Sequence, residues 1–234
     1  MFKVASWNLN SVRSRLTHVT TWLKDREPDV LLMQELKGTE FPSDTFQSLG
    51  YESVAVTQKA YNGVAILSRH PMKTIAKTLV GDDSDSHARF LEVIIKGIRI
   101  VNIYFPNGNP VGSDKFAYKL AWMDRLTQEM IRWKRDDVQT LIGGDFNVIP
   151  EDIDCQAVVV GARCFVSAGA ASPLSCDVRY WLYGCVQVVA RGRNRTFHIL
   201  GLLSAGVPTQ PRYTNRSLLI VSNAGRSTGK LRNR

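Results

Sequence analysis

Short apolar runs alternate with one-sided apolar stretches in the first part of the chain. Phe2–Trp7 is a short apolar strand, and Val30–Met33 is an apolar run too short for a helix, which indicates a buried strand. Between them, Arg13–Lys24 carries apolar residues at the spacing of one helix face. Those residues are Leu16, Val19, Trp22 and Leu23. The pattern predicts a strand, a helix and a second strand, in that order.

The same alternation continues to Cys155. Further strands are predicted at Tyr51–Thr57, Val64–Ser68, Phe90–Ile95, Ile98–Ile103 and Gln139–Gly143. A long helix is predicted from about Asp114 to Trp133, and its apolar face consists of Phe116, Leu120, Met123, Met130 and Trp133. Helices that alternate with several strands indicate an α/β fold, in which two sheets pack together with helices outside.

The pattern changes after Cys155. Val158–Val160 is an isolated apolar run, and Ser167–Pro173 consists of small residues without a helical or strand stripe. Arg191–Arg195 and Gly225–Arg234 are typical of disorder. We therefore divide the chain into residues 1–155, part of an α/β domain, and residues 156–234, a basic segment of different character. A domain boundary or a change of reading frame would each produce this division.

The net charge of +9 is distributed unevenly. Residues 156–234 contain eleven Lys and Arg against one acid, Asp177, which gives +10. The remaining nineteen basic and twenty acidic residues give −1 for residues 1–155. A basic tail on a balanced domain is typical of a nucleic-acid-binding arm, but out-of-frame translation would produce it as well.

The sequence also bears on the cellular compartment. It contains no apolar stretch of about 18 residues that would cross a membrane. Met1–Asn8 lacks the basic region, apolar core and cleavage site of a signal peptide, so we expect it to be a strand of the mature fold. The four cysteines have no C-x-x-C spacing, and free thiols are the default. We expect a cytoplasmic monomer that does not bind membranes.

Polar motifs follow four of the predicted strands. They are Trp7–Asn10, Gln34–Lys37, Asn102–Gly108 and Gly143–Pro150. If these strand ends converge, they collect two carboxylates, several carboxamides and a phenol. That set suits a hard cation with oxygen ligands and a phosphate to be attacked. Taken singly, each residue also has an ordinary structural explanation, as a solvated acid, a turn former or a core aromatic.

The order of these motifs resembles exonuclease III and the bacterial abasic-site endonucleases of the endonuclease/exonuclease/phosphatase superfamily. The resemblance is carried by W-N-L-N, P-D-V-L-L-M-Q-E-L-K, Y-N-G-V-A-I-L-S, R-F-L-E-V, N-I-Y-F-P-N-G and G-D-F-N-V-I-P-E-D-I-D, which together span residues 1–155. Tyr104–Gly108 resembles the DNA-repair branch, because the deoxyribonuclease I and sphingomyelinase branches usually place a His at the position of Tyr104.

The resemblance implies a two-sheet α/β sandwich of the deoxyribonuclease I type and a Mg²⁺-dependent phosphodiesterase, with Mn²⁺ as the alternative metal. Asn8 and Glu35 would belong to the metal site, with Glu35 as its principal ligand. The implied partner is double-stranded DNA with abasic sites or blocked 3′ ends.

The resemblance also assigns roles to residues around the metal. Tyr104 would contact the scissile phosphate, and Asp145 would orient and deprotonate the attacking water. Asn147 would hold the phosphate or the substrate. Lys115 and Lys119, on the helix that follows, would either contact DNA phosphates or remain solvated.

The second half of the family pattern is absent. It should supply an F-W-D-Y segment, a G-x-R-I-D segment and a terminal S-D-H, in which the His stabilises the transition state and the Asp orients it. His198, the last histidine of the chain, has no Asp neighbour. The expected sandwich is therefore incomplete and carries an off-family C-terminal tail.

Back-translation accounts for the absence. Codons compatible with Pro208–Ser217, read from their second base, encode Q-R-N-R-G-I-R-I-D, and the next codon completes H. The same offset converts Ile199–Leu202 into F-W-D-Y and Val160–Val166 into W-E-x-D-A-L-F. Three family strings, in family order and at one offset, are hard to obtain by chance. We infer a single frameshift near Cys155–Gln156, either genuine or a sequencing error.

This hypothesis has two consequences. Half of a two-sheet sandwich should leave strand edges and an apolar sheet face unpaired. The chain should also be inactive or nearly so. Two other functions remain open on the sequence: a phosphatase or phosphodiesterase acting on small molecules or lipids, and a non-enzymatic basic protein that binds DNA through residues 156–234.

Overall fold

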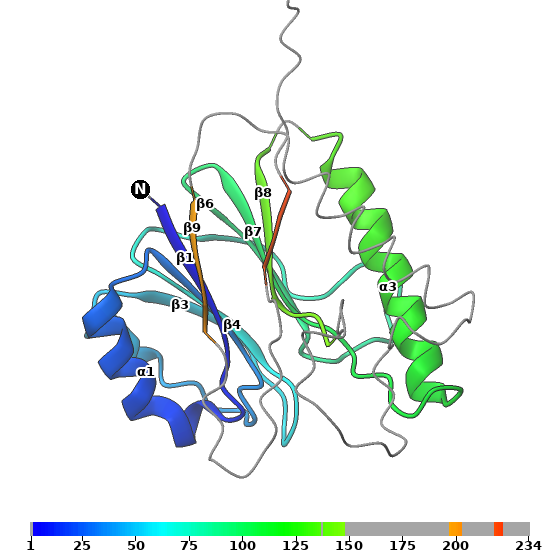
Figure 1. Ribbon diagram of the computed structural model, residues 1–234, viewed down its shortest axis with the longest axis horizontal. Coiled ribbons are helices and arrows are strands. Elements are labelled where there is room, and N and C mark those ends of the chain that lie inside the picture. The colour runs from blue at the N-terminus through cyan, green and yellow to red at the C-terminus, as the bar shows by residue number, and fades with distance from the viewer. Residues whose placement is uncertain (1, 137, 148–196, 203–217, 222–234) are drawn as a thin grey trace, which may run out of the picture.

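Two five-stranded sheets pack face to face between helices (Figure 1). The computed structural model describes residues 2–136, 138–147, 197–202 and 218–221. The first sheet has the strand order β3-β4-β2-β1-β9, and the second has the order β10-β8-β7-β6-β5. The predicted α/β sandwich of two sheets is confirmed.

Every strand and helix predicted before residue 156 is present, with ends shifted by a few residues at most. The elements are β1 (Phe2–Asn8), α1 (Val12–Arg26), β2 (Val30–Gln34), α2 (Ser43–Gln47), β3 (Glu52–Val56), β4 (Val64–Ser68), β5 (Lys73–Ala76), β6 (Phe90–Ile95), β7 (Ile98–Tyr104), α3 (Asp114–Trp133), β8 (Thr140–Asp145), β9 (Phe197–Leu202) and β10 (Leu218–Val221). The sequence did not predict α2, β5, β9 or β10. Within the described ranges, no helix is both long and apolar enough to cross a membrane.

Strand β2 shows how the layers are built. Because side chains alternate between the faces of a strand, Leu31 and Met33 point to one side and Val30 and Leu32 to the other. Leu31 and Met33 belong to the apolar cluster that includes Leu23 of α1. Val30 and Leu32 belong to the cluster between the two sheets. A continuous apolar run is therefore explained by burial on both faces.

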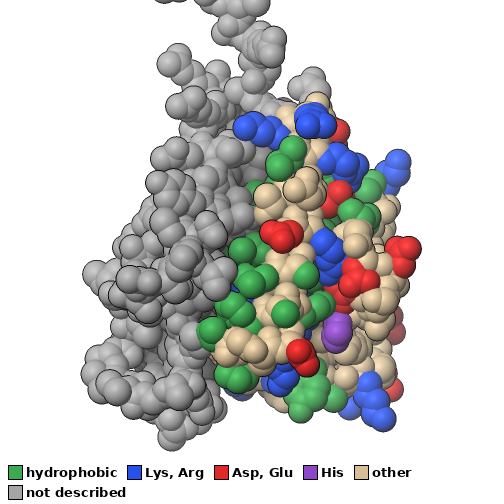
Figure 2. All heavy atoms as spheres, turned by 90° about the vertical axis from the view of Figure 1, so that its right-hand side faces the viewer, with side chains coloured by type: hydrophobic (Ala, Val, Ile, Leu, Met, Phe, Trp, Pro, Cys, Tyr) green, Lys and Arg blue, Asp and Glu red, His purple; other side chains and the backbone are tan. Residues whose placement is uncertain are grey.

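Helix α3 covers the outer face of the second sheet. The side chain of Ser113 caps the N-terminus of α3 and accepts a hydrogen bond from the backbone N–H of Phe116. Trp122, Leu126 and Trp133 are buried in the cluster formed against this sheet. Figure 2 looks onto the side of the molecule where α3 lies and shows basic and acidic side chains interspersed over the described surface. That face therefore carries both signs of charge.

The two described strands beyond residue 155 are edge strands, one in each sheet. β9 pairs in parallel with β1, and β10 pairs antiparallel with β8. The expectation of unpaired edges was therefore wrong for β1 and β8. Backbone pairing needs no particular side chains, so a segment without a family motif can supply it. The predicted disorder of Arg191–Arg195 and Gly225–Arg234 falls outside the described residues, as does the proposed boundary at Cys155 and Gln156.

Candidate active site

Four strand ends meet at one end of the sandwich and bring the predicted side chains together. Asn8 ends β1, and Glu35 follows β2 in the first sheet. Tyr104 ends β7 and Asp145 ends β8, and these two residues are register partners in the second sheet. Glu35 has a φ of 54°, in the left-handed region, so the chain turns sharply as it leaves β2. The predicted convergence of these residues is present in the structure.

The side-chain amide of Asn8 joins the two carboxylates across the sheets. Its Nδ2 donates to Oε1 of Glu35 at 2.8 Å and to Oδ2 of Asp145 at 2.7 Å. Its Oδ1 accepts the backbone N–H of Asn10 at 3.1 Å. Because carboxylates only accept hydrogen bonds, the orientation of the Asn8 amide is fixed. The side-chain nitrogen of Asn8 therefore holds the carboxylates of Glu35 and Asp145 close to each other.

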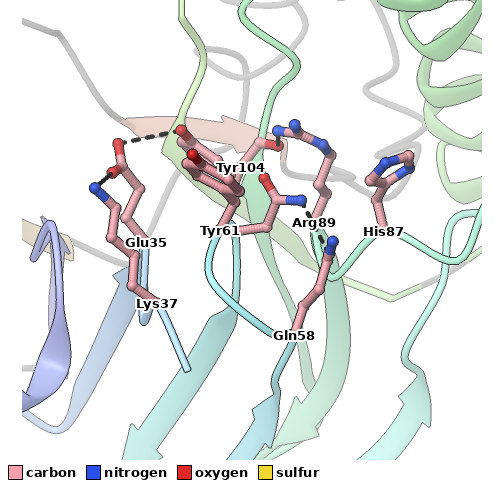
Figure 3. A pocket seen from close by; sticks show the side chains of 8 residues that line it. Glu35, Lys37, Gln58, Tyr61, His87, Arg89 and Tyr104 are labelled. Atoms are coloured by element: carbon pink, nitrogen blue, oxygen red, sulfur yellow. Dashed lines mark hydrogen bonds and ion pairs between the residues drawn. The ribbon is translucent and has the colours of Figure 1, made fainter. Parts of the chain in front are cut away.

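The carboxylate of Glu35 also contacts the phenol of Tyr104 and the ammonium of Lys37. The hydroxyl of Tyr104 donates to Oε1 at 3.1 Å, and Nζ of Lys37 lies 3.1 Å from Oε2 (Figure 3). Burial, followed by the nearby charges of Glu35 and Asp145, raises the pKa of Tyr104 above its usual value. The phenol therefore stays protonated and remains a hydrogen-bond donor at physiological pH.

Asp145 is the more buried of the two acids. It is 4% exposed, and its Oδ1 accepts the backbone N–H of Asn147 at 2.9 Å. Burial raises the pKa of Asp145, and the charge of Glu35 acts in the same direction, against the hydrogen bonds from Asn147 and Asn8. A carboxyl group with a raised pKa is suited to taking a proton from a reacting water.

Asn147 and Lys119 hold the loops around this site. Nδ2 of Asn147 donates to the backbone carbonyl of Phe105 at 2.7 Å. Lys119 is 5% exposed, and its Nζ donates to the carbonyls of Asn107 and Asn147 at 3.1 and 2.9 Å. This buried position argues against the predicted phosphate contact of Lys119 and against a solvated side chain. Lys119 instead ties the loop after β7 to the loop after β8.

A buried polar bridge lies beneath the site. Nε2 of Gln34 donates to Oδ1 of Asn102 at 2.7 Å. Nδ2 of Asn102 donates to the carbonyls of Met33 and Ala65 at 2.9 and 2.8 Å. The bridge joins β2 and β4 to β7 inside an otherwise apolar layer, directly before Glu35. Its partners are satisfied, so it fixes the relative position of the sheets at the site.

Gly144 is required by the close approach of β8 to β7, and its substitution gives a testable prediction. Its φ is +139°, and an added Cβ would lie 1.9 Å from the carbonyl oxygen of Ile103. Gly144→Ala should destabilise the fold by on the order of 3 kcal/mol or more, because backbone must move. Urea denaturation of the chain measures this free energy of unfolding.

Gly97→Ala is the matched control, since Gly97 has a φ of +76° but no atom within 4 Å of an added Cβ. It should cost about 1 to 2 kcal/mol from backbone strain alone. Equal losses in the two variants would contradict the steric explanation for Gly144.

A cavity of about 340 Å³ opens beside Glu35 and Tyr104. Its other lining residues are Lys37, Gln58, Tyr61, Asn62, His87 and Arg89 (Figure 3). A second cavity, of about 490 Å³, shares His87 and Arg89 and is lined further along by Lys115. The contact of Lys115 with DNA phosphates stays a prediction. Tyr61, Asn62 and Arg89 stood in the motif strings without an assigned role, and His87 had no motif.

The donor set fits a hard cation that keeps part of its water shell. Asn8 and Glu35 offer amide and carboxylate oxygens. Among the residues that the structure describes, no group of three or more His, Cys, Asp or Glu could hold a metal. Mg²⁺ is commonly bound through one or two carboxylates and several waters, so an all-protein cage is not needed. The residues present are compatible with Mg²⁺.

Comparison with known families identifies the fold. The family profile described as "Endonuclease/Exonuclease/phosphatase family" matches residues 5–199. The chain belongs to this family. Exodeoxyribonuclease III from Haemophilus influenzae is 30% identical over 159 residues, which are 65% of this chain and 60% of that protein. The chain therefore spans less than two thirds of the length of that relative.

Solved structures of the same fold are similar over most of both chains. An AP endonuclease from Archaeoglobus fulgidus superposes with a TM-score of 0.74 at 30% identity, covering 94% of this chain and 87% of that one. A 3′ phosphatase from Neisseria, bound to a product DNA hairpin, gives a TM-score of 0.72 at 25% identity, covering 93% and 86%. Each of these endonuclease/exonuclease/phosphatase relatives is an enzyme.

Proposed function

We propose that this chain is built for Mg²⁺-dependent hydrolysis of phosphodiester bonds in DNA, in the manner of exodeoxyribonuclease III. Its substrate would be double-stranded DNA with abasic sites or blocked 3′ ends. The observation that carries the proposal is the single amide of Asn8 bound to both Glu35 and Asp145, with the hydroxyl of Tyr104 on the same oxygen of Glu35. The relatives named above include an exodeoxyribonuclease and an AP endonuclease, which supports this proposal.

Glu35 and Asn8 would hold the Mg²⁺, and Mn²⁺ is the alternative. The bound ion would neutralise charge on the phosphate oxygens. Asn8 would need its amide oxygen for the metal, and that oxygen now accepts the N–H of Asn10. Glu35 is more accessible than Asp145, so it is the principal ligand in this proposal.

The protein groups would then divide the chemistry of attack. Asp145 would orient a water and take its proton, for which burial and the neighbouring Glu35 raise its pKa. Tyr104, held protonated, would turn its single hydroxyl proton from Glu35 to an oxygen of the scissile phosphate. Asn147 would fix the geometry of Asp145 through its backbone N–H, and its side chain would reach substrate only after leaving the carbonyl of Phe105.

We further propose that this activity is strongly impaired in the chain as encoded. The His–Asp pair expected from the second half of the family pattern does not occur in the sequence in its family motif. The H. influenzae alignment spans 159 residues, close to the length of residues 1–155, which supports a loss of family sequence near that point. The family profile runs to residue 199, so the boundary itself remains a proposal.

Metal binding tests the first part of the proposal on the chain as it exists. Mg²⁺ should raise the melting temperature, because the folded site binds it and the unfolded chain does not. The free energy of unfolding should rise by about 3 kcal/mol at a Mg²⁺ concentration of about 100 times Kd. The Glu35→Gln variant should lose most of this stabilisation by Mg²⁺. Thermal unfolding with and without Mg²⁺ measures the difference.

Glu40→Gln is the matched control, because Glu40 is an exposed acid that pairs with Arg13 away from the cavity. It should keep the wild-type response. Equal Mg²⁺ responses in Glu35→Gln and Glu40→Gln would refute the assignment of Glu35 as the metal ligand.

The substrate class is tested by the activity that the chain retains. Under single-turnover conditions, residual Mg²⁺-dependent cleavage should occur on a duplex with one abasic site. It should be absent on a small phosphate monoester and on a phospholipid. Faster hydrolysis of either small substrate than of the duplex would favour the phosphatase alternative.

A further inference from the structure

Lys119 of α3 is a buried cation that the proposed reaction does not use. It is 5% exposed, whereas Lys115, one turn earlier on the same helix, is exposed to solvent. Removing an ammonium from water is unfavourable unless hydrogen bonds and nearby negative charge replace its hydration. The burial of Lys119 therefore has to be explained by the groups around its ammonium.

The ammonium of Lys119 joins the two loops that follow the catalytic strands. Its Nζ donates to the carbonyl of Asn107 at 3.1 Å, in the loop after β7. It also donates to the carbonyl of Asn147 at 2.9 Å, in the loop after β8. Hydrogen bonds from a charged donor are roughly twice as strong as neutral ones. The loop after Tyr104 is thus fastened directly to the loop after Asp145.

The aliphatic part of Lys119 is confined as well. Gly108 has a φ of +77°, and an added Cβ would lie 2.5 Å from Cδ of Lys119. The backbone of the loop after β7 therefore lies against the lysine side chain. Nζ is 5.9 Å from the centroid of the Phe105 ring, which packs edge-on against Trp122 of α3 at a centroid distance of 4.8 Å. These contacts give the ammonium a defined position.

The carbonyl at the other end of this link belongs to a residue in an uncommon conformation. Asn147 has a φ of 48°, in the left-handed region that few residues other than glycine adopt. In this conformation its backbone N–H donates to Oδ1 of Asp145 at 2.9 Å, and its Nδ2 donates to the carbonyl of Phe105 at 2.7 Å. The backbone N–H of Phe105 donates in turn to the carbonyl of Asp145 at 2.8 Å. The orientation of the Asp145 carboxylate therefore depends on the turn at Asn147.

The positive charge of Lys119 also acts on Asp145. Asp145 is 4% exposed, so both charges lie inside the protein. Burial raises the pKa of Asp145, and the charge of Lys119 is among the influences that lower it. A buried ammonium and a buried carboxylate that attract each other offset part of the desolvation cost of both. The loop carbonyls and Asp145 together explain why a lysine is buried at this position.

We propose that Lys119 is a positioning residue for Asp145. Its buried ammonium holds the turn from Asp145 to Asn147 against the loop after β7, and this contact keeps the carboxylate in one orientation. The inference rests on the proposed function, because Asp145 is the base only in that reaction. Lys119 touches neither the substrate nor the metal in this proposal and acts through the two loops.

Hydrogen exchange of single backbone amides in the full chain, followed by two-dimensional NMR, tests the inference without catalysis. Lys119→Met keeps the length of the side chain but removes its donor and its charge. Exchange at the amides of Asn147 and Phe105 should accelerate by about 10- to 100-fold, the effect of losing one hydrogen bond to a charged group. The amides of β2 and β4 should keep their rates, because the opening is local.

Two further variants show whether the charged donor is the cause. Lys119→Arg should recover most of the lost protection, because a guanidinium also donates to carbonyl oxygens. Lys24→Met removes an exposed lysine of α1 and should leave all exchange rates unchanged. No recovery in Lys119→Arg would overturn the role of the ammonium. Unfolding of Lys119→Met, or equal acceleration in β2 and β4, would show that Lys119 serves overall stability and would overturn the positioning role.

DNA binding distinguishes positioning from the direct phosphate contact that the sequence suggested for Lys119. Fluorescence anisotropy of a duplex with one abasic-site analogue gives Kd for the wild type and for Lys119→Met at several salt concentrations. A positioning residue leaves Kd and its salt dependence unchanged. Weaker binding, with a slope of log Kd against log salt that is smaller by about 1, would identify a phosphate contact and overturn the inference.

The outcomes separate the inference from the function on which it rests. Faster exchange at Asn147 and Phe105 that Lys119→Arg reverses, with unchanged DNA binding, supports the inference. Unchanged exchange at both amides in Lys119→Met overturns it and leaves the DNA proposal in place. If the wild type binds no duplex at any salt concentration, the DNA proposal fails, and the exchange rates alone decide whether Lys119 holds Asp145.

Discussion

Restoring the second reading frame should raise the rate of abasic-site nicking by about 10²–10³-fold or more over the chain as encoded. Removing one nucleotide near codons 155–156 would place the frame that encodes F-W-D-Y and G-I-R-I-D after Cys155. That range is the usual effect of losing one preorganised transition-state donor, and a His–Asp pair with its supporting segment supplies more than one. Single-turnover cleavage of an abasic duplex measures the gain.

The control for this prediction uses the same repaired gene with Glu35→Gln, which should remain at the level of the chain as encoded. Sequencing the gene across codons 150–160 examines the cause independently. An intact frame in the gene, together with the same tail in related genes, would refute the frameshift hypothesis. A repaired protein no faster than the present chain would show that the missing half is not what limits activity.

Asp145→Asn in the repaired protein should lower the cleavage rate by about 10²–10⁴-fold, the usual contribution of a positioned general base. The substitution keeps the size of the side chain beside Asn8 but removes the carboxylate. The base must be ionised to act, so the rate should fall on the acid side. Because burial and Glu35 raise the pKa of Asp145, that fall should begin above the ordinary pKa of an aspartate, about 3.9.

Asp124→Asn is the matched control, since Asp124 is exposed on α3. It should leave both the rate and its pH profile unchanged. A pH profile that keeps its acid limb in Asp145→Asn would assign that limb to another group. A loss of less than about 10-fold would remove Asp145 from the role of base.

The sequence predicted the part of the fold whose burial is continuous or strictly one-sided. Val30–Met33 and Phe90–Ile95 are strands because both of their faces are covered, and such runs are readable without any partner. α3 was found at its observed ends, because its apolar stripe is long. β5 was missed because its residues are mostly exposed.

The strands after residue 155 were missed for a different reason. Leu218–Val221 is an apolar run of the same kind as Val30–Met33, so its sequence was sufficient to suggest a strand. A single short apolar run without periodic neighbours does not by itself predict a strand. Phe197–Leu202 has a His and a Gly within six residues, and its pairing with β1 follows from the free edge of that strand.

At the site, the sequence motifs placed candidate residues at strand ends, but they did not predict which side chains contact one another. Glu35, Tyr104 and Asp145 were selected from strand ends, whereas the bridging amide of Asn8 depends on two sheets meeting. Lys119 was misplaced because a lysine on a helix is usually solvated, and only the tertiary structure buries its ammonium among loop carbonyls.

The most direct test of the account is cleavage of an abasic duplex by the repaired protein with Mg²⁺, with EDTA, and with Mg²⁺ in the Glu35→Gln variant. We predict rapid cleavage in the first case and loss of cleavage in the other two. Cleavage that persists in EDTA, or that is unaffected by Glu35→Gln, would contradict the assignment of a Mg²⁺-dependent DNA phosphodiesterase to the site formed by Asn8, Glu35, Tyr104 and Asp145.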